Sequence, residues 1–330
     1  MKKTSEPKLV RLRDLDLEDT RFRISMSSDL EPLILSIRKI GLLHCPVVVA
    51  REGRLVLVCG WKRVAACLKL RISRLRVLVL DEADDLEVFL FALYENIAGR
   101  ELSVLEKAEA LLKALAFGLA EARLWREVMP LLKVPPTAAF RDAYLAISKL
   151  DPATKKMVAE KGLPFSLARM LAELSADSLG EILPVLCPLG QNKQKEIVES
   201  LLEISKRRSL SPQKVLRFPE IQAVLRSKTW TPLEKADRFR LALRRRRFPN
   251  LTSWEERFRT AQREVRWPRE ISLEPAPYFE TDDIEASFRF KDEREFKARL
   301  GELLEVTSQK GFPKLFRRGR PSSTNRLKRS

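Results

Sequence analysis

Histidine and cysteine are scarce in this 330-residue sequence, which holds one histidine and four cysteines. The cysteines stand at positions 45, 59, 67 and 187, and no two of them form a C-x-x-C pair. Neither a structural zinc site nor a disulfide framework is therefore expected. Any mechanism that needs two histidines, such as that of the H-E-x-x-H metalloproteases, is excluded.

Long apolar runs are missing as well. Stretches such as residues 88–94 fall far short of the about 20 apolar residues that a membrane-spanning helix needs. Lys2 and Lys3 are not followed by an apolar core, so the start of the sequence lacks the pattern of a secretory signal. We expect a cytoplasmic protein with no membrane partner.

Acidic residues are sparse in the last third of the sequence. The formal net charge is +18, and residues 206–269 hold 19 Lys and Arg against six Asp and Glu. Residues 312–330 hold seven Lys and Arg and no acid. Basic charge that is segregated in this way favours a polyanion such as nucleic acid, and the four consecutive arginines at 244–247 favour it further. The alternative is a solvated basic surface that aids solubility.

The first part of the chain has an α/β pattern. Its order of strands and helices is β-α-β-β-α-β-α-α, which predicts a compact domain over residues 1–118. The last helix begins at a capping box, Ser103 with Glu106. The expected strands are 8–15, 46–50, 55–58 and 75–80, and the expected helices are 30–40, 61–70, 84–96 and 103–118.

The rest of the chain is predicted to be mainly helical. Helices over 124–132 and 137–147, separated by 133–136, fit a helix-turn-helix in a domain over 119–210, although an ordinary helical hairpin has the same pattern. A basic helical segment follows over 211–269, with helices capped at Thr231 and Ser253. We expect a strand-strand-helix unit over 270–310 and a disordered basic tail over 311–330. The predicted fold class is α+β.

Two short segments of the first domain carry the candidate chemistry. Gly60 precedes Lys62 and Arg63 at a strand-to-helix turn, where backbone N–H groups and the helix dipole favour phosphate. Glu95 and Asn96 offer hard oxygen atoms that suit Mg²⁺. Each pattern also has an ordinary interpretation, because glycines often precede basic helices and Glu-Asn is common at solvated helix ends. The prediction of a phosphate and metal site rests on the occurrence of both segments in one α/β pattern.

Four segments carry a family resemblance. Residues 36–49 contain S-I, G-L-L and P-V-V-V, residues 60–66 read G-W-K-R-V-A-A, and residues 95–108 read E-N-I-A-G-R-E-L-S-V-L-E-K-A. The fourth segment, residues 149–171, begins K-L-D-P. In this order they resemble the ParB family of partition proteins, whose third motif reads E-N-I-x-R-x-x-L-S-x-x-E-x-A and is the most specific. The likeness covers about residues 8–210, with one residue inserted before Arg100.

The resemblance implies a first domain with the ParB/sulfiredoxin fold that binds CTP with Mg²⁺ and controls a dimeric DNA clamp. The residues that it implies are Gly60, Lys62, Arg63 and Arg23 for the phosphates, and Glu95 and Asn96 for the metal. Three residues depart from the family pattern. Arg21 replaces a glutamine implicated in hydrolysis, Trp61 replaces a glutamate, and Lys62 replaces an arginine whose forked contact lysine cannot make. We therefore expect nucleotide binding with weak or absent hydrolysis, at most a weak CTPase. Sulfiredoxin's catalytic cysteine would fall at Trp61, so peroxiredoxin repair is disfavoured.

Three functions compete. The leading hypothesis is a ParB-like DNA-binding protein for chromosome or plasmid partition or for transcription regulation. It would act as a homodimer on double-stranded DNA at the nucleoid of a bacterium, and the family also allows a partner ATPase. The expected DNA contacts are Thr137, Arg141, Arg244, Arg245, Arg246 and Arg247. The second is a non-catalytic DNA-binding adaptor in which Trp61 fills the pocket. The third, a nuclease, is disfavoured because Glu95 would have to bind metal almost alone.

Overall fold

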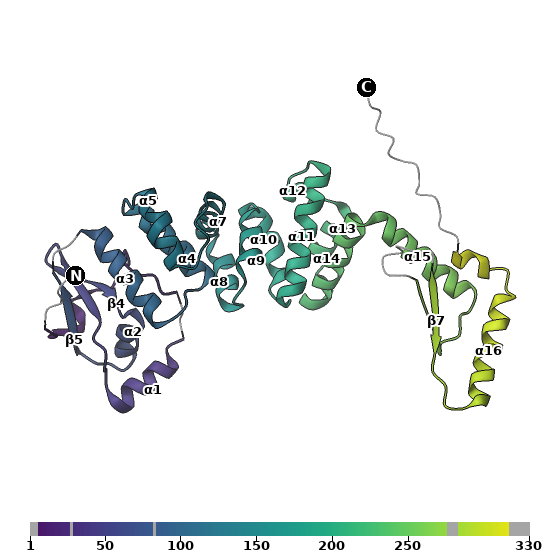
Figure 1. Ribbon diagram of the computed structural model, residues 1–330, viewed down its shortest axis with the longest axis horizontal. Coiled ribbons are helices and arrows are strands. Elements are labelled where there is room, and N and C mark those ends of the chain that lie inside the picture. Colours follow the sequence, from purple (N-terminus) through teal and green to yellow (C-terminus); the bar gives the residue numbers. More distant parts are fainter. Residues whose placement is uncertain (1–5, 27–28, 82–83, 276–282, 317–330) are drawn as a thin grey trace, which may run out of the picture. The chain divides into compact units, whose positions relative to one another are not determined.

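The computed structural model describes residues 6–26, 29–81, 84–275 and 283–316 (Figure 1). The chain divides into two compact units, residues 1–199 and residues 200–330. The predicted α+β class is confirmed, because the first unit combines a five-stranded sheet with helices and the second combines helices with a two-stranded sheet. Within the described residues, no helix is both long enough and apolar enough to cross a membrane.

The sheet of the first unit has the order β1-β5-β3-β4-β2. The strand predicted over 8–15 is wrong as a single element. It is broken by a 3-10 turn, η1, at Leu12–Asp14, and its halves pair at opposite edges, β1 with β5 and β2 with β4. The strands are β1 (Lys8–Arg11), β2 (Leu15–Asp16), β3 (Val47–Arg51), β4 (Arg54–Cys59) and β5 (Arg74–Leu80).

Three helices pack with this sheet, and they begin and end close to the predicted positions. They are α1 (Glu31–Ile40), α2 (Trp61–Lys69) and α3 (Asp85–Gly99). Apolar side chains of α1 and α2 share a core with the sheet residues Val48 and Leu57, both fully buried. Helix α3 packs against β4. This packing brings the start of α2 and the C-terminal half of α3 to the same end of the β3–β4 hairpin, where β4 ends.

The remaining helices of the first unit follow in sequence. The helix predicted over 124–132 is found as part of a continuous helical run over residues 121–131, which contains a π turn, η2, just before Pro130. In this turn the N–H of Met129 bonds to the carbonyl of Leu124. Proline lacks an N–H, so regular α-helical bonding cannot continue through it. The elements are α4 (Val104–Ala116), α5 (Glu121–Arg123), η2 (Leu124–Val128), α6 (Met129–Leu131), α7 (Ala138–Ser148), α8 (Pro152–Glu160), α9 (Phe165–Ala172), α10 (Ala176–Leu186) and α11 (Gln191–Arg208), the last of which extends into the second unit.

The second unit confirms the capping box at Thr231 but not the start predicted at Ser253. Proline at position 249 begins α15 earlier, so Ser253 lies inside the helix. Residues 312–316, predicted to be disordered, form a 3-10 turn with Leu315 buried, and the rest of the predicted tail lies outside the described residues. The elements are α12 (Pro212–Leu216), α13 (Pro219–Arg226), α14 (Pro232–Arg247), α15 (Pro249–Glu264), β6 (Ile271–Pro275), β7 (Ile284–Phe288), α16 (Glu293–Thr307) and η4 (Phe312–Phe316).

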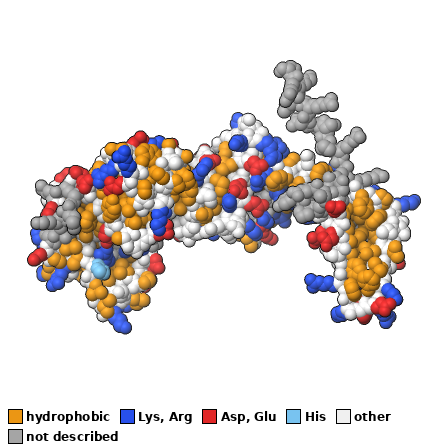
Figure 2. Space-filling model, in the orientation of Figure 1, with side chains coloured by type: hydrophobic (Ala, Val, Ile, Leu, Met, Phe, Trp, Pro, Cys, Tyr) orange, Lys and Arg blue, Asp and Glu red, His pale blue; other side chains and the backbone are white. Residues whose placement is uncertain are grey.

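An apolar face lies on the last part of the second unit, where Figure 2 shows a continuous orange surface. Phe290, Phe296, Leu300 and Leu304 are exposed there, and the rings of Phe290 and Phe296 lie 4.8 Å apart. A separate small core holds α15 against α16 and η4. It is formed by Phe258, Ala261, Val265, Val306 and Leu315.

Candidate functional site

Gly60 forms the turn between β4 and α2. Its φ of 92° and ψ of 23° are left-handed, a conformation that favours glycine. A Cβ atom at this position would lie 3.0 Å from the Cα of Pro46 and 3.1 Å from its Cβ. No side chain caps α2, so the first-turn N–H groups at the positive end of the helix dipole have no side-chain acceptor. The local geometry matches a phosphate-binding turn.

Arg63 and Glu95 form an ion pair at this turn. A guanidinium Nη2 of Arg63 lies 2.7 Å from Oε1 of Glu95. Arg63 also donates to the backbone carbonyls of His44 and Cys45, at 3.3 and 3.2 Å. The structure therefore brings together one residue predicted to bind phosphate and one predicted to bind metal, and they satisfy each other. Lys62 pairs with no acid among the described residues.

Trp61 packs into the domain beneath Arg23. The Arg23 guanidinium carbon lies 5.2 Å from the centroid of the Trp61 ring, a cation–π contact. The Trp61 ring contacts the core of α1 and α2, and its indole N–H is buried with no hydrogen-bond partner in the described parts of the chain. Arg23 also donates from Nε to the carbonyl of Ser25 at 3.2 Å. Trp61 thus fills space beside the glycine turn, in contact with the cation predicted to share the site.

Arg21 lies far from this cluster along α3. It donates to Asp19 and, at 2.8 Å, to Asp85, which also pairs with Arg51 at the hairpin end of β3. Burial alone would raise the pKa of Asp85, but the bonds from both arginines outweigh it and hold the pKa below its usual value. Asp85 and Glu95 are ten residues apart on α3, about 15 Å along its axis. The guanidinium of Arg21 therefore points to the opposite end of the helix.

The two predicted metal ligands do not converge. The Asn96 side-chain N–H donates to the carbonyl of Ala92 in its own helix at 2.8 Å, while Glu95 faces Arg63. No group of three or more His, Cys, Asp and Glu residues in the described part of the chain could hold a metal ion. A single carboxylate does not make a protein-only Mg²⁺ site. It fits Mg²⁺ that arrives with phosphate oxygens, which is a common way for this ion to be bound.

Cys59 lies next to the site but has no reactive character. The side chain is fully buried, and burial raises the pKa of its thiol well above the usual value, with the neighbouring Glu95 carboxylate raising it further. A thiol held in this way is not a nucleophile at neutral pH.

Helix α4 holds the segment that carries Arg23, and sequence reasoning missed this support. The buried Glu106 carboxylate accepts two bonds from Arg100, at 2.7 and 2.9 Å, and one each from the backbone N–H groups of Ser103 and Met26. Burial alone would raise the pKa of Glu106, but these bonds outweigh it and lower the pKa. The capping box signalled the contact with Ser103, whereas the contact with Met26 spans 80 residues and has no local signal.

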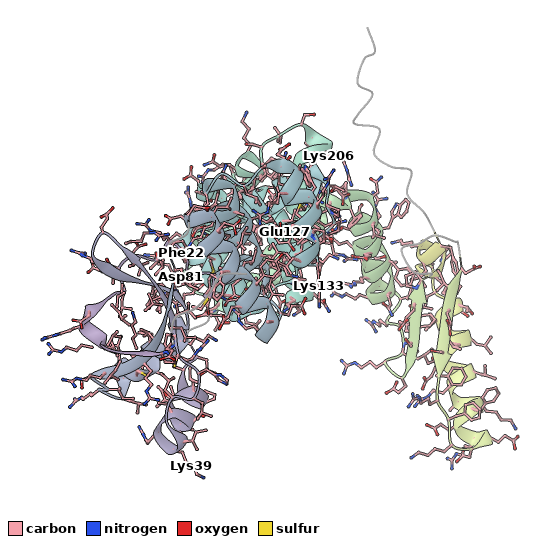
Figure 3. The ribbon with its side chains drawn as sticks, turned by 60° about the vertical axis from the view of Figure 1, so that its left-hand side comes forward. Phe22, Lys39, Asp81, Glu127, Lys133 and Lys206 are labelled. Carbon is pink, nitrogen blue, oxygen red and sulfur yellow. The ribbon has the colours of Figure 1, made fainter. Side chains whose placement is uncertain are left out.

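Lys113 and Phe22 also hold the segment that carries Arg23 against α4. The Lys113 ammonium group donates to the backbone carbonyls of Thr20 and Arg23, at 2.9 and 2.7 Å. Phe22, labelled in Figure 3, is fully buried and stacks on Phe117 with ring centroids 5.8 Å apart. The backbone of residues 20–26 is thereby fixed against α4. This fixes the position from which Arg23 reaches Trp61.

The residues predicted to contact DNA in the helix-turn-helix lie on α7. Thr137 is exposed at the N-terminal end of that helix. Arg141 pairs with Glu121 at 2.6 Å and with Asp142 at 2.8 Å, and its guanidinium lies over the ring of Trp125. Arg141 thus ties α7 to the preceding α5 and η2.

The four consecutive arginines at the end of α14 are engaged within the second unit. Ion-pair distances are 2.7, 3.2 and 2.5 Å for the first, second and fourth of them. Each pairs with a different glutamate: Arg244 with Glu255, Arg245 with Glu256, Arg246 with Glu220, and Arg247 with Glu203. Their positive charge is therefore largely balanced inside the fold.

Comparison with known proteins supports the family resemblance. No protein-family model matches the chain. The probable chromosome-partitioning protein ParB of Chlamydia muridarum is 31% identical over 185 residues, which cover 52% of this chain and 64% of that protein. The chain therefore spans just under two thirds of the curated relative that it matches. Over that half of its length the chain is similar to a ParB protein, in agreement with the resemblance of its motifs.

Solved structures of ParB proteins are also similar to parts of the chain. The C-terminally truncated ParB of Caulobacter crescentus complexed with CTP-gamma-S is 21% identical, covering 52% of this chain and 94% of that one, with a TM-score of 0.26. The same protein complexed to the centromeric parS site is 18% identical, covering 63% and 95%, with a TM-score of 0.33. A pNOB8-like ParB N-domain is 15% identical, covering 74% and 98%, with a TM-score of 0.36.

Proposed function

We propose that this chain is a ParB-like DNA-binding protein whose first unit binds CTP with Mg²⁺ at the turn before α2. The observation that carries the proposal is Gly60, whose left-handed backbone and contact with Pro46 leave no room for a side chain. Such a turn serves the close approach of an anion to backbone N–H groups. Lys62, Arg63 and Arg23 would bind the phosphates.

When the nucleotide binds, the ion pair between Arg63 and Glu95 would break and each residue would take a new partner. A triphosphate offers Arg63 oxygen atoms that can replace the carboxylate of Glu95. Glu95, with Asn96, would then be available to the Mg²⁺ that accompanies the phosphates and balances their charge. Arg21 is bonded at the other end of α3, so it would take no part in orienting a water molecule. We expect binding without appreciable hydrolysis.

The DNA-binding part of the proposal rests on α7 and on the basic second unit. Thr137 is exposed at the start of α7, where the second helix of a helix-turn-helix meets the major groove. The chain would act in the cytoplasm, on double-stranded DNA of the nucleoid, as a homodimer. Its role would be partition or transcription regulation, with a partner ATPase in the former case.

Direct binding of each ribonucleoside triphosphate with Mg²⁺, with and without duplex DNA, tests the nucleotide proposal. We expect CTP to bind the full chain selectively and Arg63→Ala to lose that binding. Lys69→Ala is the matched control, because Lys69 is an exposed cation in the last turn of the same helix. Equal CTP affinity in both variants would overturn the assignment of the site. Phosphate release in the same samples measures hydrolysis.

The second candidate function is a DNA-binding adaptor without a nucleotide. It is favoured by Trp61, which packs beside the turn, and by Arg63, which already has a carboxylate partner. Under this alternative the unaltered chain binds duplex DNA but no triphosphate. Trp61→Glu places a carboxylate where the family has one. CTP binding that appears only in a folded Trp61→Glu variant would mean that Trp61 blocks the site.

A further inference from the structure

One face of the first unit's sheet, the face turned away from α1 and α2, is apolar on two strands and basic on two others. Val49 of β3 and Val56 of β4 pair across the strands on this face and are buried, and α3 packs against β4. On β5 and β1 the same face is exposed. It carries a block of four side chains, here called the arginine face: Leu9, Arg11, Arg74 and Arg76.

The register of β1 against β5 determines how this block is built. Leu75, which lies between Arg74 and Arg76, is buried in the core shared with α1 and α2. Side chains alternate along a strand, so the two arginines point to the opposite face. In the antiparallel pair, Arg11 lies opposite Arg74 and Leu9 lies opposite Arg76. The four side chains therefore stand side by side on one surface, where Leu9 is 62% exposed.

The charge of the three arginines is not balanced by neighbouring acids. None of the three makes a side-chain hydrogen bond or ion pair within the described ranges of the chain. The acids that follow β1 have other partners. Asp14 lies 3.9 Å from Arg13, and Asp16 lies 3.4 Å from Arg54. The arginine face therefore presents its full positive charge to solvent.

Two of these arginines are held close together by the sheet itself. Arg11 and Arg74 are direct cross-strand partners, and the Cβ atoms of such partners are only about 5 Å apart. Like charges at this position destabilise a sheet. Guanidinium groups bind carboxylates through forked hydrogen bonds, so an acidic partner would replace this repulsion with attraction. Other unpaired cations of the unit lie on helices, where no strand register fixes a second cation opposite them.

The composition of the block indicates the kind of anion that fits it. The outer surface of duplex DNA presents mainly phosphate oxygens, whereas a protein segment presents carboxylates and apolar side chains together. All three cations are arginines, which are enriched in protein interfaces, whereas lysines are depleted there. We propose that the arginine face docks an acidic segment of a partner protein. Carboxylates of that segment pair with the three arginines, and an apolar side chain of the segment covers Leu9. This docking does not depend on the nucleotide or DNA binding proposed above.

The test is the binding of the full chain to a fluorescein-labelled peptide of glutamates with a single leucine at its centre, followed by fluorescence anisotropy. The variant is Arg11→Gln/Arg74→Gln/Arg76→Gln. Each lost ion pair should weaken binding by a factor of about two, so we expect the triple variant to bind the peptide about tenfold more weakly. A photoreactive group beside the leucine of the peptide locates the contact, and we expect covalent attachment on β1 or β5.

The matched control is Arg38→Gln/Lys39→Gln/Lys69→Gln. It removes the same charge from exposed positions on α1 and α2, which cover the other face of the sheet. Without peptide, the arginine variant should melt at the same temperature as the unaltered chain or higher, because it loses a repulsion. A lower melting temperature would mean that the arginines support the fold, and it would overturn the proposal.

Peptide binding that weakens in the arginine variant and not in the control, with attachment on β1 or β5, supports the proposal. Equal weakening in both variants would show that net charge alone matters and would overturn it. An unchanged affinity, attachment elsewhere or no binding by the unaltered chain would also overturn it. A parallel titration with duplex DNA separates the two kinds of polyanion, since an equal loss of duplex binding in the arginine variant would assign the face to nucleic acid instead. Failure of the unaltered chain to bind duplex would count against the proposed DNA binding and leave the peptide test valid.

Discussion

Single residues at the candidate site are constrained by contacts that their own motifs do not contain. Gly60 is limited by Pro46, which lies 14 positions earlier, and Glu106 is bonded to Met26 across 80 positions. These two residues allow sharp tests, because each has a counterpart elsewhere in the first unit that lacks the extra contact.

Gly60→Ala should destabilise the first unit more than Gly53→Ala. Both glycines have positive φ, so both variants carry backbone strain of about 1 kcal/mol. Only the variant at position 60 adds a methyl group against Pro46, since nothing lies within 4 Å of the corresponding position at Gly53. We expect an extra loss of about 1–2 kcal/mol in the free energy of unfolding, measured with urea. Equal losses would contradict the tight approach of Pro46.

Glu106→Gln should remove a pH-dependent part of the stability. The pKa of Glu106 is lower in the folded state, so its carboxylate stabilises the fold above the unfolded pKa of about 4.3, and this is lost as the pH falls through the folded pKa. At neutral pH we expect a loss of about 2 kcal/mol, which shrinks on acidification. Urea unfolding at pH 7 and at about pH 4 measures both.

The control for that variant is Glu101→Gln. The Glu101 side chain is 67% exposed and its pair with Lys107 is 3.5 Å long, so its contribution should be within a few tenths of a kcal/mol. If Glu106→Gln lowers the free energy of unfolding equally at both pH values, the charge of Glu106 is not the cause. The loss would then come from altered packing.

At the scale of elements, patterns within a few consecutive residues predict helix starts well, whereas the sequence does not show which strands pair with one another. The capping boxes at Ser103 and Thr231 were predicted because a cap depends on four consecutive residues. The same pattern at Ser253 misled, since the proline at 249 had already started the helix. The strand over 8–15 was predicted as one element because alternation does not reveal that its halves pair with different strands.

At the candidate site, too, contacts between neighbouring residues can be predicted and contacts between distant residues cannot. Gly60, Lys62 and Arg63 could be found from the sequence because the turn and the helix start are contiguous. That Arg63 pairs with Glu95, and that Arg21 bonds to Asp85, depends on how α3 packs beside the hairpin, and no local pattern encodes it. The arginines at 244–247 were predicted as DNA contacts from their charge. Their glutamate partners come from neighbouring helices that only the fold brings close.

At the scale of the whole molecule, net charge overstates the number of available cations. The chain carries a formal charge of +18, yet its densest basic run is paired. The sequence after Phe316 adds six further Lys and Arg without an acid. Unlike the earlier residues 312–316, which contribute Leu315 to a core, this segment can be removed without cutting a described element.

Deleting residues 317–330 should therefore weaken DNA binding and reduce its salt dependence. Removal of six cations lowers the electrostatic attraction to the duplex, and the slope of log K against log salt should shrink by about 0.9 for each cation that contacts a phosphate. A salt titration with the full chain as reference measures this, and the melting temperature should stay the same. An unaltered slope would place all phosphate contacts before residue 317.

In the proposed nucleotide site, the ion pair between Arg63 and Glu95 would make binding selective by competition between anions. Any anion that approaches the guanidinium must compensate for the loss of a carboxylate that is already 2.7 Å away. A monovalent anion such as chloride gains too little for that exchange, and it leaves Glu95 without a counter-charge. A phosphate chain that brings its own divalent cation supplies both partners at once. The ion pair would thus disfavour the binding of simple salt anions and allow the binding of the metal–nucleotide complex.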